Sequence, residues 1–177
     1  TNSEVTDNGS NFIQNVAKFG GAIYFSKATA TFTSTSLNNN YAVDGAVLYA
    51  DSEAEIHLDS INWSNNNANN DGGCIVFTGS AMTEITSSTF SSNYAKETGS
   101  AVYFLGTSSS EISNSTFTDN LAEEGNTVSL MFAPTTVSNI TLKDNFAYAD
   151  STGIFVTFSE VTIEDSTFTS EDFPEDA

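Results

Sequence analysis

The sequence predicts an all-β chain wound into a right-handed, single-stranded parallel β-helix of about six to seven rungs of roughly 26 residues. Three observations predict this fold. A large apolar residue recurs at a nearly constant interval, an asparagine and an alanine follow it at fixed distances, and a glycine with a short apolar segment completes each period. A chain of 177 residues suits one domain with a substantial core.

The large apolar residues mark the periods, and we call them the anchors. Their successive spacings are 25, 26, 27, 27, 25 and 26 residues. The anchors are Phe12, Leu37, Trp63, Phe90, Phe117, Leu142 and Phe168. Because stacked repeats place like residues over like, this column predicts a continuous core. Each buried anchor is expected to contribute about 1.5–3 kcal/mol.

Short apolar segments lie on either side of the anchors. One apolar segment precedes each anchor. Another follows each of the first six anchors after a glycine, as at residues 22–25 and 101–104. These glycines are Gly21, Gly45, Gly73, Gly99, Gly125 and Gly153. We therefore expect three short alternating segments in each period, separated by turns rich in Gly, Asn, Asp and Ser.

An asparagine stands three residues after each of the first six anchors, and an alanine five residues after. These asparagines are Asn15, Asn40, Asn66, Asn93, Asn120 and Asn145. At the strand spacing of about 4.8 Å, their amides are expected to hydrogen-bond from rung to rung as a structural ladder. The alternative is that asparagine only tolerates a left-handed turn. The alanines suggest a turn too tight for a larger side chain.

Two motifs alternate in one register along the chain. Residues 12–15, 90–93 and 117–120 read Phe-x-x-Asn, and residues 20–23 read Gly-Gly-Ala-Ile, with variants in the next three periods. This combination resembles the polymorphic outer membrane protein (Pmp) repeat, which forms β-helical passengers of chlamydial autotransporters. The resemblance covers essentially the whole chain. It implies an adhesive, sometimes self-associating rod that is extracellular or exposed at the cell surface.

The charge balance excludes several partners. The chain has 23 acidic residues against four lysines and no arginine, for a net charge of −19. Nucleic acids and anionic membranes both require basic residues, so neither is expected to bind. No apolar run approaches the roughly 20 residues of a membrane span, so membrane insertion is not expected. The expected partners are further copies or a parent solenoid, stacked head to tail, and a cell-surface protein or glycan.

No residues form a recognisable active site, so we expect a non-enzymatic protein without catalytic, cofactor-binding or metal-binding residues. The alternative is a polysaccharide-active β-helix enzyme, which requires clustered carboxylates. Glu84 and Glu111 share one register and should stack, as should Asp119 and Asp144. Such pairs are candidates for Ca²⁺, although no known calcium motif is present.

Two single residues have simple interpretations. His57 is expected to be an exposed strand residue, because a metal site or proton relay needs partners that the sequence does not place. Cys74 occupies the position that alanine fills in other periods, at Ala22, Ala46 and Ala101. We therefore expect a small packed side chain and not a nucleophile.

Four sequons make Asn8, Asn62, Asn114 and Asn139 candidates for N-glycosylation in a secreted protein. None of them belongs to the ladder. Threonines flanking the later anchors, as in residues 116–118 and 167–169, are expected to point outward in columns. Such a Thr-x-Thr array is similar to those of ice-binding solenoids, which makes ice binding a second alternative; a plain exposed strand face is the simpler explanation.

The two ends repeat one phase of the coil. The tetrapeptide Ser-Glu-Val-Thr occurs at residues 3–6 and 159–162, each time nine residues before an anchor. A head-to-tail contact that does not close produces a filament, so either a longer solenoid or a stacking unit is expected. We expect the β-helix to span residues 1–170 and an acidic tail or cap to span residues 171–177.

Overall fold

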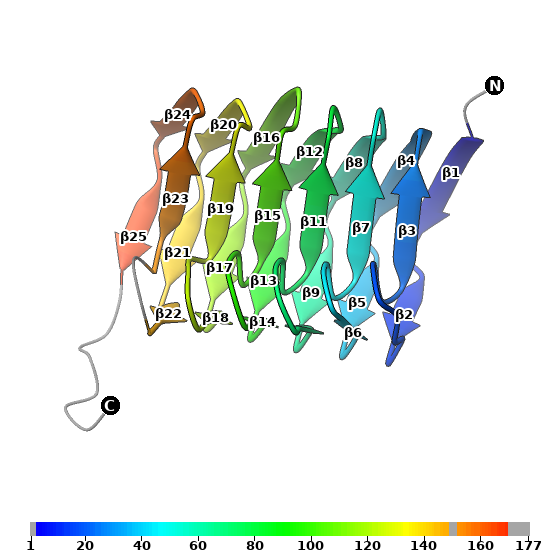
Figure 1. The fold of residues 1–177 in the computed structure, drawn as a ribbon, viewed down its shortest axis with the longest axis horizontal. Helices are drawn as coiled ribbons and strands as arrows, with labels where there is room; N and C mark the ends of the chain where they lie inside the picture. Colours follow the sequence, from blue (N-terminus) through cyan, green and yellow to red (C-terminus); the bar gives the residue numbers. More distant parts are fainter. Residues whose placement is uncertain (1–2, 149–151, 170–177) are drawn as a thin grey trace.

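A computed structural model describes residues 3–148 and 152–169, which form 25 strands, β1–β25, and no helix. All strand pairs are parallel, and the strands lie in four sheets of seven, five, six and seven strands. The chain coils about one axis, with the N-terminal rung at one end and the C-terminal rung at the other (Figure 1). The predicted parallel β-helix is confirmed.

Two of the sheets flank the corner that leads to each anchor. The pre-anchor sheet contains β1 (Ser3–Asn8), β4 (Ala28–Thr33), β8 (Glu55–Asp59), β12 (Met82–Thr86), β16 (Ser109–Ser113), β20 (Thr135–Ser138) and β24 (Val161–Glu164). The anchor sheet contains β2 (Asn11–Ile13), β5 (Ser36–Asn38), β9 (Asn62–Ser64), β13 (Thr89–Ser91), β17 (Thr116–Thr118), β21 (Thr141–Lys143) and β25 (Thr167–Thr169).

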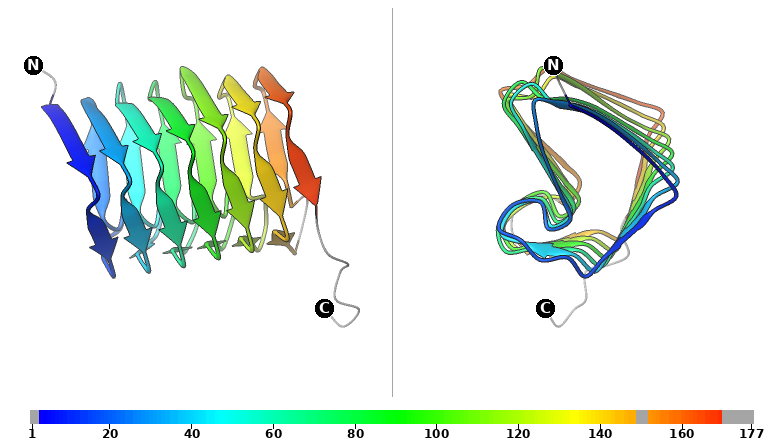
Figure 2. Two further views of the ribbon diagram at one scale, coloured as in Figure 1. Left: turned by 180° about the vertical axis from the view of Figure 1, so that it is seen from behind. Right: turned by 90° about the vertical axis from the view of Figure 1, so that its right-hand side faces the viewer.

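The other two sheets complete each coil. The short sheet contains β6 (Tyr41–Ala42), β10 (Asn67–Ala68), β14 (Tyr94–Ala95), β18 (Leu121–Ala122) and β22 (Phe146–Ala147). The post-glycine sheet contains β3 (Ile23–Ser26), β7 (Leu48–Asp51), β11 (Ile75–Thr78), β15 (Val102–Leu105), β19 (Val128–Met131) and β23 (Ile154–Thr157). Seen along the axis, successive coils superimpose (Figure 2).

The expectation of three segments per period is wrong, because each complete coil has a fourth, two-residue strand in the short sheet. The constant spacing of the alanines that follow the anchors therefore reflects an inward-facing strand position and not only a tight turn. Ala68 and Ala95 are fully buried and cluster with Ala46 from the adjoining loop. A larger side chain has no room between the short sheet and this loop.

The anchors stack in register through the centre of the rod. Trp63 pairs with Leu37 on one side and Phe90 on the other, and Phe90 pairs with Phe117. The rings of Trp63 and Phe90 are 5.5 Å apart and those of Phe90 and Phe117 are 4.7 Å apart, each pair nearly parallel. These anchors are fully buried. Stacked aromatic rings add to the stability that burial alone provides.

Glycine is required where the loop after the short sheet meets the neighbouring coil. A Cβ on Gly73 would lie 1.9 Å from the carbonyl oxygen of Ser100. Gly72 has a φ of 64°, which disfavours a side chain for a second reason. These two glycines mark close packing of loop against loop, but the six glycines noted in the sequence do not form one column, because Gly45 stands opposite Gly72 and Gly73 stands opposite Ala46.

The expected boundary between the β-helix and an acidic segment at residues 171–177 lies outside the described residues. Within them, no helix has the length and apolar character that a membrane span needs.

Candidate functional surfaces

The asparagine column forms a continuous hydrogen-bonded ladder inside the rod. Each side-chain amide donates to the Oδ1 of the next asparagine, at 2.9 Å from Asn93 to Asn120 and 3.0 Å from Asn66 to Asn93. The Asn93 amide also donates to the carbonyl oxygen of Trp63 at 3.1 Å. The left-handed backbone conformation belongs to the residue before each ladder asparagine, as at Asn65 and Ser92. The alternative that the ladder asparagines occupy the left-handed position is therefore wrong.

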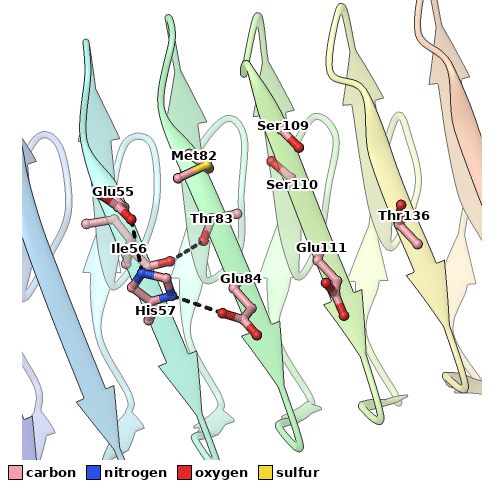
Figure 3. Close-up of a pocket in the computed structure, with 10 residues that line it drawn as sticks. All are labelled: Glu55, Ile56, His57, Met82, Thr83, Glu84, Ser109, Ser110, Glu111 and Thr136. Carbon is pink, nitrogen blue, oxygen red and sulfur yellow. Dashed lines mark hydrogen bonds and ion pairs between the residues drawn. The ribbon is translucent and has the colours of Figure 1, made fainter.

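His57 lies between two carboxylates on the outer face of the pre-anchor sheet (Figure 3). Its Nδ1 is 3.0 Å from Oε2 of Glu84, which stands opposite it on β12. Its Nε2 is 3.4 Å from Oε1 of Glu55, two residues earlier on β8. The sequence interpretation left His57 without partners, and the structure corrects it. The histidine side chain is 40% exposed, so its strand position is partly open to solvent.

A shallow depression of about 210 Å³ surrounds this histidine. Glu84 and Glu111 pair across β12 and β16, which confirms that they share a register. The depression is lined by Glu55, Ile56, His57, Met82, Thr83, Glu84, Ser109, Ser110, Glu111 and Thr136 (Figure 3). The Thr83 hydroxyl donates to the Ile56 carbonyl oxygen at 3.1 Å, so this group is already paired.

A second depression, of about 200 Å³, shares Ser109, Ser110 and Thr136 with the first. It continues toward the C-terminal rung and is lined there by Pro134, Thr135, Glu160 and Thr162. We call the two depressions together the acidic groove. Its lining contains Glu55, Glu84, Glu111 and Glu160 but no lysine or arginine.

The candidates for calcium do not assemble into a metal site within the described residues. No group of three or more His, Cys, Asp or Glu side chains there is arranged to hold a metal ion. Asp119 lies in the turn one coil before Asp144, and its backbone N–H donates to the Lys143 carbonyl oxygen at 3.3 Å. The Lys143 ammonium lies 3.3 Å from Asp144, so a cation already neutralises that carboxylate.

The sequon asparagines are exposed and separate from the ladder. Asn8 ends β1, and Asn62 points outward from β9. Asn114 and Asn139 occupy left-handed turns on adjacent coils, with φ of 50° and 49°. The Asn139 amide donates to Oδ1 of Asn114 at 2.7 Å, so these two side chains touch.

The threonines before the later anchors form one column. Thr116 pairs with Thr89 on one side and Thr141 on the other, and Thr141 pairs with Thr167. The column after the anchors is interrupted by the exposed Lys143. The outer face of the anchor sheet therefore presents one regular row of hydroxyl groups.

Cys74 is fully buried beside the ladder. The Asn66 amide lies 3.8 Å from its sulfur, and burial raises the pKa of the thiol well above its ordinary value. A thiol that stays protonated and inaccessible is a poor nucleophile. The predicted packing role holds, but the register corrects the alignment: Cys74 stands opposite Val47 and Ala101, whereas Ala46 stands opposite Gly73.

Two features were not singled out from the sequence. Phe132 and Phe158 stack at the corners before β20 and β24, with ring centroids 5.0 Å apart, and are 52% and 79% exposed. Asp71 lies in a loop between coils, where burial raises its pKa to about 6. The charges of Glu97 and Asp44 also raise this pKa, while the hydrogen bond from the Thr98 backbone N–H opposes them.

Comparison with known protein families identifies the architecture. The model of the right-handed beta helix region matches residues 21–173. The chain belongs to this family. Comparisons with curated proteins and with solved structures give no match. This family membership supports a β-helix repeat, which is the broader part of the resemblance to the Pmp repeat.

Proposed function

We propose that the chain is a non-enzymatic extracellular rod, structural and adhesive, that extends by stacking coil upon coil. Either further copies or a longer solenoid of the Pmp type would supply the neighbouring coils. The fold gives a mechanism for this role, because a stiff rod holds rows of outward groups at a fixed spacing. The net charge of −19 favours solubility of such a rod.

The observation that carries the proposal is that core side chains are fully buried only where described coils lie on both sides of them along the axis. Val5 continues the column of the buried Ala30, yet is 39% exposed. Ile163 and Phe168 continue the columns of Val137 and Leu142, yet are 46% and 47% exposed. Apolar columns with unpaired strand edges favour addition of another coil.

The outer faces support the adhesive part of the proposal. The pre-anchor sheet presents the acidic groove, and the anchor sheet presents a row of hydroxyl groups. All four sequon asparagines are exposed, which suits a secreted glycoprotein. A cell-surface protein or glycan is the expected partner class.

Sedimentation velocity and negative-stain imaging over a range of concentrations test the proposed stacking. We expect rods that lengthen with concentration and with salt, because salt screens the repulsion between acidic copies. Phe168→Asp should abolish lengthening, whereas Thr118→Asp, on the outer face of a central coil, should preserve it. A chain that stays strictly monomeric at high concentration and high salt would disprove the stacking proposal.

A polysaccharide-active enzyme is a second candidate, because Glu84 and Glu111 lie opposite each other and His57 contacts Glu84. Paired carboxylates on adjacent strands are the groups that glycoside hydrolysis uses. Incubation with neutral and acidic polysaccharides, with and without Ca²⁺, tests this candidate. Product release that disappears in Glu84→Gln would replace the non-enzymatic proposal.

Ice binding stays a prediction that the aligned threonine column favours. Thermal hysteresis that is lost in Thr116→Tyr would support it. No hysteresis in the unaltered protein would reject it.

A further inference from the structure

We propose that the acidic groove and the exposed phenylalanine pair beside it form a docking surface for an extended basic peptide segment of another protein. The inference rests on the adhesive part of the proposed function and names the chemistry of the partner. It concerns the side of the rod, whereas the stacking proposal concerns its ends.

The phenylalanine pair is the first observation. Phe132 and Phe158 follow the register that aligns Thr78, Leu105, Met131 and Thr157, so they occupy the position that Gly79 and Gly106 fill in earlier coils. All four residues have a left-handed backbone, with φ of 50° and 51° at the two phenylalanines. A bulky side chain is unfavourable in this conformation, and its exposure to water is unfavourable as well. Aromatic side chains held at such positions are candidates for binding anchors.

The groove is the second observation. Pro134 and Glu160 line it and lie two residues after Phe132 and Phe158, respectively, so the aromatic pair stands beside its C-terminal end. From Thr162 on β24 the groove crosses β20, β16 and β12 to His57 on β8, five strands in all. Five strands at a spacing of about 4.8 Å span roughly 19 Å, which suits about six residues of an extended peptide.

Charge selects the occupant. The groove lining contains four glutamates and no lysine or arginine. A second copy carries the same net charge of −19, and an anionic glycan is also negative, so both are repelled. Arginine pairs with carboxylates and also stacks on aromatic rings, which matches the two parts of this surface. An extended segment with alternating arginine and apolar residues therefore fits both the groove and the phenylalanine pair.

The binding experiment uses the intact chain and three rhodamine-labelled hexapeptides that alternate leucine with arginine, glutamate or serine. Fluorescence anisotropy should show saturable binding of the arginine peptide and none of the glutamate peptide. Higher salt should weaken the arginine complex, because its charges are then screened. Failure of the arginine peptide to bind at low salt would overturn the inference, and so would equal binding of the serine peptide.

Two double variants locate the surface. Phe132→Gly with Phe158→Gly introduces the residue that Gly79 and Gly106 provide in the two preceding coils, so thermal stability should be maintained while affinity falls about tenfold or more. Glu84→Gln with Glu111→Gln should also weaken binding, whereas the matched control Glu97→Gln with Glu124→Gln, in exposed loops outside the groove, should not. An equal loss in the control would show non-specific attraction to an acidic protein and would overturn the inference.

The test separates this inference from the proposed function. The glycine variant should sediment like the unaltered protein, because neither phenylalanine belongs to the stacked core columns. Rods that lengthen but bind no arginine peptide would reject the docking surface alone. Neutral oligosaccharide binding that is lost in the glycine variant would reject the basic partner and keep the surface as a glycan site.

Discussion

The central coils and the last described coil follow the same sequence pattern but differ in burial. Phe90 and Ile112 are completely buried, whereas the equivalent Phe168 and Ile163 are 47% and 46% exposed. The difference arises because a central residue has a coil on each side, while a residue of the last coil has one. In this fold the full burial of a side chain therefore requires neighbouring coils along the axis in addition to its own coil.

At the corners between the post-glycine sheet and the pre-anchor sheet, the later coils carry larger side chains than the central coils. Central coils use Gly79 and Gly106 at the left-handed corner, where no side chain is exposed. The later coils place Phe132 and Phe158 there, at conformational cost and in contact with water. Packing therefore explains the residues of the core columns, whereas the corner phenylalanines have no packing reason beyond their mutual stacking.

The largest expected effect is the loss of a central anchor. Phe90→Ala removes a ring stacked between Trp63 and Phe117, so the free energy of unfolding should fall by about 3–5 kcal/mol. Phe168→Ala should cost much less, because its ring is half exposed. Urea denaturation followed by circular dichroism measures both. Equal losses at the two positions would show that the coil of Phe168 is covered by another coil in solution.

The next largest effect compares a glycine of a central coil with a glycine of the last described coil. Gly73→Ala places a methyl group against the Ser100 carbonyl oxygen and should destabilise the fold by about 1–3 kcal/mol or more. Among the described residues, a Cβ on Gly153 meets the Phe168 ring, at 3.6 Å, so Gly153→Ala should be nearly neutral. Thermal unfolding midpoints distinguish the two variants. A neutral Gly73→Ala would mean that the loops of adjacent coils separate more easily than their packing indicates.

A third effect isolates the ladder. Asn93→Ala removes the Oδ1 that accepts from the Asn66 amide and the amide that donates to Asn120, which breaks the ladder in the middle and should cost about 1–3 kcal/mol. The control Thr118→Ala, on the outer face of the anchor sheet, should stay within about 0.5 kcal/mol of the unaltered protein. Urea titration of both variants provides the comparison. Similar losses would indicate that the ladder contributes no more than an ordinary surface position.

The sequence predicted the features that depend on stacking of identical residues. The anchor spacing placed Trp63 over Phe90, and the asparagine column became the hydrogen-bonded ladder. The pairing of Glu84 with Glu111 followed from the same register. These predictions succeeded because a solenoid repeats one environment in every coil, so a column of sequence becomes a column of structure.

The remaining features depend on details that the repeat does not encode. The two-residue strands, such as Tyr41–Ala42, are too short to show alternation. The contact between His57 and Glu84 was missed. These two residues are 27 positions apart in the sequence, as Trp63 and Phe90 are. Phe132 was not singled out, because its left-handed backbone leaves no mark in its own residue type.

The smallest effect is a pH dependence from Asp71, whose carboxyl lies between the acidic groups of the coils before and after it. Its pKa is about 6 against an ordinary value of 3.8, so the folded chain holds this proton more tightly than the unfolded chain. The resulting stabilisation is complete below pH 3.8 and is lost as pH rises through about 6. Asp71→Asn retains an acceptor for the Thr98 N–H without the charge. The thermal midpoint of this variant should therefore exceed that of the unaltered protein at pH 7 and should match it at pH 4. A difference that is the same at both values would show that the Asp71 carboxyl ionises in the folded coil as it does in water.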